Sequence, residues 1–108
     1  MDKKLQARLT KIAKQIEALK PIEETFLNLE ASEKMLFAQL FLTKIGSIEE
    51  KKNLVYDSKE WRDFSKGFVQ SRVMLNEARR LLELQDKAYM AEYLEYKIEN
   101  EAIKRGVG

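Results

Sequence analysis

The two ends of the chain carry opposite net charge, and this constrains its fold more than any other feature. Residues 1–20 contain six basic side chains against two acidic ones, a net charge of +4, whereas residues 83–101 contain six acidic against two basic, a net charge of −4. We therefore expect the end of the chain to lie along its beginning, in the opposite direction. With residue i set opposite residue 103 − i, the expected charge pairs are Lys4 with Glu99, Arg8 with Glu95 and Lys11 with Glu92.

Apolar residues near the start of the chain have the spacing of a helix that pairs with another helix along one seam. Intervals of four and three residues alternate, with polar residues or alanine between them, at Leu5, Leu9, Ile12, Ile16 and Leu19. Pro21 then either kinks the helix or opens a new one at its first turn. Because the seam resumes in step at Ile22, the sequence predicts a first arm over about residues 2–45, kinked or split near Pro21.

The connection over residues 46–57 carries its own helix signals. Gly46 suits a left-handed end to the first arm. Ser47 with Glu50 has the sequence of a capping box, which predicts a short helix within the connection.

A second helical arm is predicted over about residues 58–105, because no strong breaker follows Ser58 until Gly106. Its apolar residues follow two neighbouring heptad tracks, which together make a wide stripe. The first track comprises Trp61, Phe64, Phe68, Leu75, Ala78, Leu82, Tyr89, Tyr96 and Ile103, and the second Leu81, Leu84, Ala88, Ala91, Ile98 and Ala102.

These patterns predict an all-α fold, a single domain over residues 1–108 that forms a long, coiled-coil-like antiparallel helical hairpin. The segment Met35–Ile45 is apolar on most sides and needs more cover than one partner helix provides. Since a hairpin of two long helices buries a small share of its surface, we expect two copies to associate as a homodimer in a helical bundle.

The residue inventory leaves little room for catalysis. The chain holds no His and no Cys, which excludes a Ser-His-Asp triad, a thiolate nucleophile and the commonest metal ligands. We expect no enzyme activity, no cofactor and no metal. The charged N-terminus lacks the apolar core of a signal peptide, and no apolar stretch approaches the ~20 residues that a bilayer requires. We therefore expect a cytoplasmic protein with no membrane partner.

Two sets of residues are candidate binding surfaces. Basic side chains that could contact nucleic acid are Lys3, Lys4, Arg8, Lys11, Arg72, Arg79 and Arg80. The alternative interpretation of the N-terminal ones is a solvated face that the acidic arm partly neutralises, and that of Arg72, Arg79 and Arg80 is a solvated helix surface. Apolar side chains that could form a self-association or partner surface are Phe37, Phe41, Leu42, Trp61 and Phe64. Their alternative interpretation is hydrophobic core.

The second arm also carries a family resemblance. Its segments Val55-Tyr56-x-Ser58-x-x-Trp61-x-x-Phe64, Ala78–Leu84 and Ala91–Asn100 resemble small, mostly uncharacterised helical proteins of tailed bacteriophages and prophages. Such proteins are similar to products of the early regions of phage genomes, so the resemblance implies a role in phage DNA metabolism or host modulation. It carries over no catalytic residue.

The leading functional hypothesis is a non-enzymatic helical accessory protein that binds a macromolecular partner, which the sequence does not identify as protein or DNA. The alternative is a nucleic-acid-binding protein that uses the basic face of the N-terminal helix.

Overall fold

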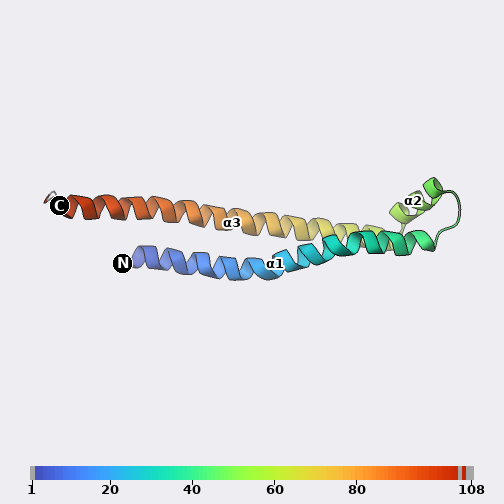
Figure 1. Cartoon of the computed structure of the whole chain (residues 1–108), viewed down its shortest axis with the longest axis horizontal. Coiled ribbons are helices and arrows are strands. Elements are labelled where there is room, and N and C mark those ends of the chain that lie inside the picture. Colours follow the sequence, from blue (N-terminus) through green and yellow to red (C-terminus); the bar gives the residue numbers. More distant parts are fainter. Residues whose placement is uncertain (1, 105, 107–108) are drawn as a thin grey trace. The chain divides into compact units, whose positions relative to one another are not determined.

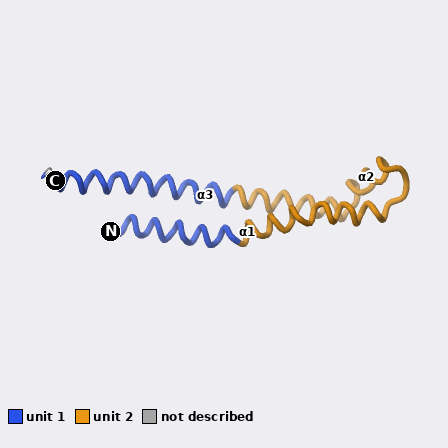
Figure 2. Tube along the Cα trace, in the orientation of Figure 1, with its two compact units in different colours: residues 1–20, 77–108 blue, residues 21–76 orange. Residues whose placement is uncertain are grey.

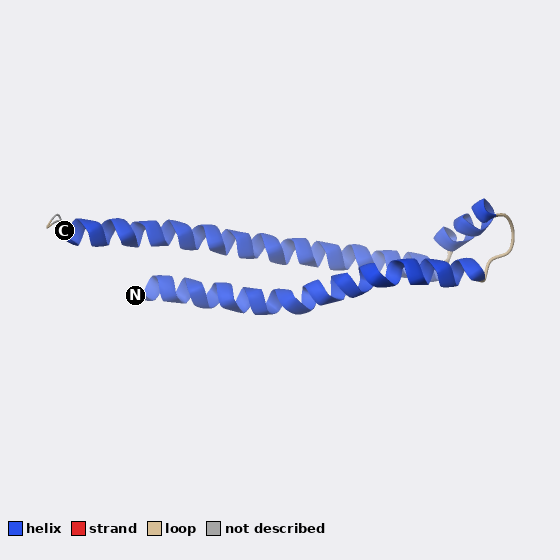
Figure 3. Ribbon diagram, in the orientation of Figure 1, coloured by secondary structure: helices blue, strands red, loops and turns tan. Residues whose placement is uncertain are grey.

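The computed structural model describes residues 2–104 and 106. Within these residues it contains three α-helices and no strand: α1 (Lys3–Leu42), α2 (Ile48–Asp57) and α3 (Lys59–Lys104) (Figures 1 and 3). The all-α prediction is confirmed, as is the short helix in the connection. The predicted end of the second arm at residue 105 lies outside the described residues.

Helix α1 runs through Pro21 without interruption, so the proline does not split the first arm. Proline has no backbone N–H, and the carbonyl of Glu17, four residues earlier, therefore loses its helical donor. On the other side of the ring, the Thr25 hydroxyl donates to the Pro21 carbonyl at 2.9 Å. A kink at this proline stays a prediction.

The first arm ends at Leu42 and not near residue 45 as predicted. The reason lies at Thr43, whose backbone N–H and hydroxyl both donate to the Leu40 carbonyl, at 3.1 and 2.7 Å, and so tighten and close the last turn. The prediction that Gly46 ends α1 is therefore wrong in position. Gly46 does adopt a φ of +132°, but within the connection, where an added Cβ would collide with the Glu50 side chain.

Serine residues begin the other two helices, as predicted. The Ser47 hydroxyl accepts a hydrogen bond from the Glu50 N–H at 3.2 Å and caps α2. The Ser58 hydroxyl donates to the Val55 carbonyl at 2.6 Å and accepts from the Trp61 N–H at 3.2 Å, so it closes α2 and opens α3. α2 and α3 are thus separated by a single residue, Ser58.

The chain forms two compact units (Figure 2). Unit 1 consists of residues 1–20 and 77–108, and unit 2 of residues 21–76. In each unit a segment of α1 lies beside a segment of α3 and runs in the opposite direction (Figure 2).

In unit 1, the seam on α1 differs from the predicted one. The buried or half-buried residues that form the α1 side of the seam with α3 are Leu5, Arg8, Ile12, Gln15 and Leu19. Leu9 and Ile16, which were predicted in the seam, are 37% and 43% exposed. The heptad intervals are preserved, but they run three then four from Leu5 and not four then three, so two polar residues replace two apolar ones.

The predicted register is also wrong. Arg8 contacts Gln85 and Glu92, so it lies across from the α3 turns between them and not from Glu95. In unit 2, Phe26 lies against Phe68, with ring centroids 5.3 Å apart, whereas the predicted register would place Glu77 opposite it. The physical reason is that polar side chains inside the seam pair with each other, and exposed charges do not outweigh them.

The core of unit 2 is largely aromatic. Its fully buried apolar side chains among the described residues are Val55 on α2 and Leu75 on α3. Rings on α3 stack along the seam, from Phe68 to Phe64 at 6.0 Å and from Phe64 to Trp61 at 5.7 Å. This confirms the first half of the predicted aromatic track on the second arm.

Candidate interaction surfaces

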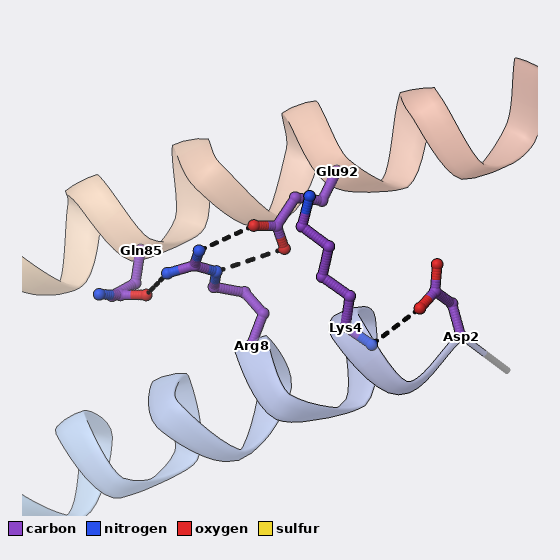
Figure 4. Close-up of polar contacts among 5 residues, drawn as sticks. All are labelled: Asp2, Lys4, Arg8, Gln85 and Glu92. Carbon is purple, nitrogen blue, oxygen red and sulfur yellow. Dashed lines mark hydrogen bonds and ion pairs between the residues drawn. The ribbon is translucent and has the colours of Figure 1, made fainter.

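A polar cluster in the seam of unit 1 joins α1 to α3 (Figure 4). The Arg8 guanidinium donates to both carboxylate oxygens of Glu92, at 2.7 and 3.3 Å, and also to the side-chain oxygen of Gln85. These hydrogen bonds lower the pKa of the Glu92 carboxyl, and the positive charges of Lys4 and Lys11 act in the same direction. Arg8 is therefore occupied by intramolecular contacts.

The other basic candidates fall in both units. Lys3, Lys4 and Lys11 are exposed on α1 in unit 1, and Arg79 and Arg80 are exposed on α3 in the same unit. In unit 2 the Arg72 guanidinium lies over the Phe68 ring, 5.0 Å from its centroid. The contacts of Arg8 with Gln85 and Glu92, and of Arg72 with Phe68, were not predicted from the sequence.

Most of the predicted partner surface is packed within unit 2. The Phe37 ring meets the Trp61 ring edge to face, with centroids 5.5 Å apart, and the Phe41 ring at 6.1 Å. The Phe64 ring also packs against Trp61, with ring centroids 5.7 Å apart. These rings are half-buried, as their alternative interpretation expected, whereas Leu42 is exposed.

The three most exposed large apolar side chains of unit 2, among the described residues, lie around the α1–α2 connection. Leu42, Ile45 and Ile48 are 82%, 88% and 69% exposed. Leu42 was a sequence candidate, while Ile48 was missed. The sequence did offer a signal for it, because two isoleucines, Ile45 and Ile48, flank the turn at Gly46-Ser47. We call Leu42, Ile45 and Ile48 the connection patch.

An open cavity of about 420 Å³ lies in the same unit, between α1, α2 and α3. It is lined by Glu33, Lys34, Phe37, Tyr56 and Trp61. Since its three rings contact one another at 5.5 to 5.9 Å, the cavity is a recess at the edge of the aromatic core.

In unit 1 the large apolar side chains of the second predicted track of α3 are exposed. Leu81, Leu84 and Ile98 are 44%, 52% and 66% exposed. The helix therefore turns Leu82 and Tyr89 of its first track toward α1 and leaves the large residues of the second track exposed, whereas Ala88 and Ala102 are half-buried. We call the row Leu81, Leu84, Ala88, Ala91, Glu95 and Ile98 the outer track.

Within residues 2–104 and 106, no group of three or more acidic side chains is arranged to hold a metal ion. None of the helices in the described part of the chain has the length and apolar character needed to cross a membrane. Comparisons with known protein families, with curated proteins and with solved structures found no match.

Proposed function

We propose that this chain is a non-enzymatic helical interaction protein that acts by binding a partner protein through the connection patch. The observation that supports the proposal is the exposure of three large apolar side chains on one short stretch, residues 42–48. Groups of exposed large apolar side chains are a feature of protein interaction sites, whereas single ones are common on any surface. Homodimerisation through helical pairing, and a phage-like role in DNA metabolism or host modulation, are parts of the same proposal.

A protein partner suits the connection patch better than nucleic acid does. Apolar side chains gain free energy when another apolar surface covers them, and they gain nothing from phosphate groups. On the N-terminal basic face, Arg8 is hydrogen-bonded to Glu92 and Gln85. The candidate phosphate contacts there are therefore the three exposed lysines, Lys3, Lys4 and Lys11.

The test is a pull-down from lysate of the native host, comparing the wild type with the double variant Leu42→Ser, Ile45→Ser. We expect the wild type to retain a protein in stoichiometric amount and the double variant to lose at least about tenfold in affinity, since two buried leucine-sized side chains are worth roughly 3 kcal/mol. Leu27→Ser, an exposed leucine on α1 in the same unit, is the matched control and should behave as the wild type.

Equal retention by the double variant and the wild type would contradict the proposal. So would captured material that nuclease removes. In that case binding to DNA should weaken with rising salt and with Lys4→Glu and Lys11→Glu.

A further inference from the structure

Unit 1 has a small apolar core. Among its described residues, Leu5 is the one apolar side chain that is fully buried. Two paired helices of this length expose most of their surface, and such layers are normally covered by a second layer of helices. The outer track of α3 is an exposed apolar face of unit 1 on which this second layer would lie.

The spacing of the outer track fits pairing with itself. Its intervals are three, four, three, four and three residues, a series that is the same in both directions. When two identical helices run in opposite directions about its centre, Leu81 lies against Ile98 of the second copy. Ala88 lies against Ala91 at the centre, where two small side chains allow the helices to approach closely.

Charge along one edge of the track selects the same orientation. Arg80 and Glu101 are exposed and occupy equivalent heptad positions on the edge that faces away from α1. In the antiparallel pairing Arg80 of each copy lies by Glu101 of the other, so two opposite-charge pairs form. In a parallel pairing Arg80 would instead lie by Gln85 of the other copy, so no Arg80–Glu101 pair would form.

We propose that the outer track is the docking surface for a second copy of this chain, with α3 packed antiparallel against α3 in a symmetric dimer. The proposal rests on the self-association in the proposed function and names the surface and orientation for it. One residue of the track, Glu95, is charged and lies opposite Leu84 of the second copy. An apolar side chain at this position would therefore strengthen the dimer.

The dissociation constant of the dimer, measured by sedimentation equilibrium, tests the surface. We expect the wild type to have twice the 12.7 kDa mass of the chain at high concentration. Leu84→Gln with Ile98→Gln should raise the dissociation constant at least about tenfold, and Glu95→Leu should lower it. Met90→Gln removes an equally exposed apolar side chain from another face of α3, and should change it less than about twofold.

Crosslinking tests the orientation, since the chain has no cysteine of its own. Mixed copies of Leu81→Cys and Ile98→Cys should form a disulfide dimer on mild oxidation, and Leu81→Cys alone should not. The proposal is overturned by a wild type that stays monomeric at millimolar concentration, by Glu95→Leu leaving the dissociation constant unchanged, or by crosslinking of Leu81→Cys to itself. A monomer that still retains a host protein through the connection patch would overturn this inference while leaving partner binding intact.

Discussion

Arg8, Gln85 and Glu92 occupy heptad positions that apolar side chains usually fill. A charged residue in a seam costs stability unless it is paired, and here one guanidinium satisfies a carboxylate and an amide at once. Only one alignment of the two helices brings these three together. We infer that the cluster fixes the register of unit 1, in the way that a polar seam residue fixes register in helix pairs.

This pairing predicts a defined pH dependence. Because Arg8 lowers the pKa of Glu92 in the folded state, the pair stabilises the fold fully above the ordinary pKa of a glutamate. As the pH falls the unfolded chain takes up its proton first, and the stabilisation is lost as the pH falls through the lower, folded-state pKa. Glu92→Gln should therefore lower the thermal unfolding midpoint at pH 7, and the difference from the wild type should shrink toward pH 3.

Circular dichroism at several pH values measures that difference. Glu99→Gln, which changes an exposed carboxylate on the same helix, should leave the midpoint close to that of the wild type throughout. A gap between Glu92→Gln and the wild type that is the same at pH 7 and pH 3 would refute the assignment.

Gln15 is the other polar residue on the α1 side of the seam, and it makes no hydrogen bond with Arg8, Gln85 or Glu92. Its side-chain oxygen is buried and has no hydrogen-bond partner among the described residues. Leucine at this position would remove an unpaired polar atom and add apolar surface to the seam, so we expect Gln15→Leu to stabilise the fold by about 1–2 kcal/mol in urea denaturation. Gln6→Leu, on the exposed side of α1, should gain nothing, and a destabilised Gln15→Leu would disprove this account.

At the level of the helices, type and the starting points of α2 and α3 follow from local chemistry, and the sequence predicts them, but it leaves open whether Pro21 divides the first arm in two. Ser47 and Ser58 act as caps because their hydroxyls reach backbone N–H groups two or three residues ahead, whatever packs nearby. The seam of α1 does not follow from local chemistry. Leu9 and Ile16 are more apolar than Arg8 and Gln15, and only the partner helix decides which pair turns inward.

Alanine substitutions at two glycines should have opposite effects on the free energy of unfolding, because one glycine has a positive φ and the other lies inside a helix. Gly46 has a φ of +132°, where a side chain is strained, and a Cβ there would meet Glu50. Gly46→Ala should cost about 1–3 kcal/mol of unfolding free energy. Gly67 lies inside α3 with open space around it, so Gly67→Ala should stabilise by about 0.5–1 kcal/mol. Urea denaturation compares both, and an equal effect of the two substitutions would show that the conformation of Gly46 is not required.

For the whole molecule, the two proposed surfaces lie in different units and share no residue. The connection patch belongs to unit 2, and the outer track belongs to unit 1. Substitutions at separate sites without common partners usually have additive effects. Leu42→Ser with Ile45→Ser should therefore leave the dimer dissociation constant unchanged, and Leu84→Gln with Ile98→Gln should leave the affinity of one chain for the partner unchanged.

The quadruple variant completes this cycle. If the surfaces act independently, its loss of partner binding equals that of the Leu42→Ser, Ile45→Ser pair, and its loss of dimerisation equals that of the Leu84→Gln, Ile98→Gln pair. Isothermal titration with the captured partner and sedimentation equilibrium measure the two quantities. A coupling free energy above about 1 kcal/mol would mean that dimerisation and partner binding depend on each other, so that the partner recognises the dimer and not the single chain.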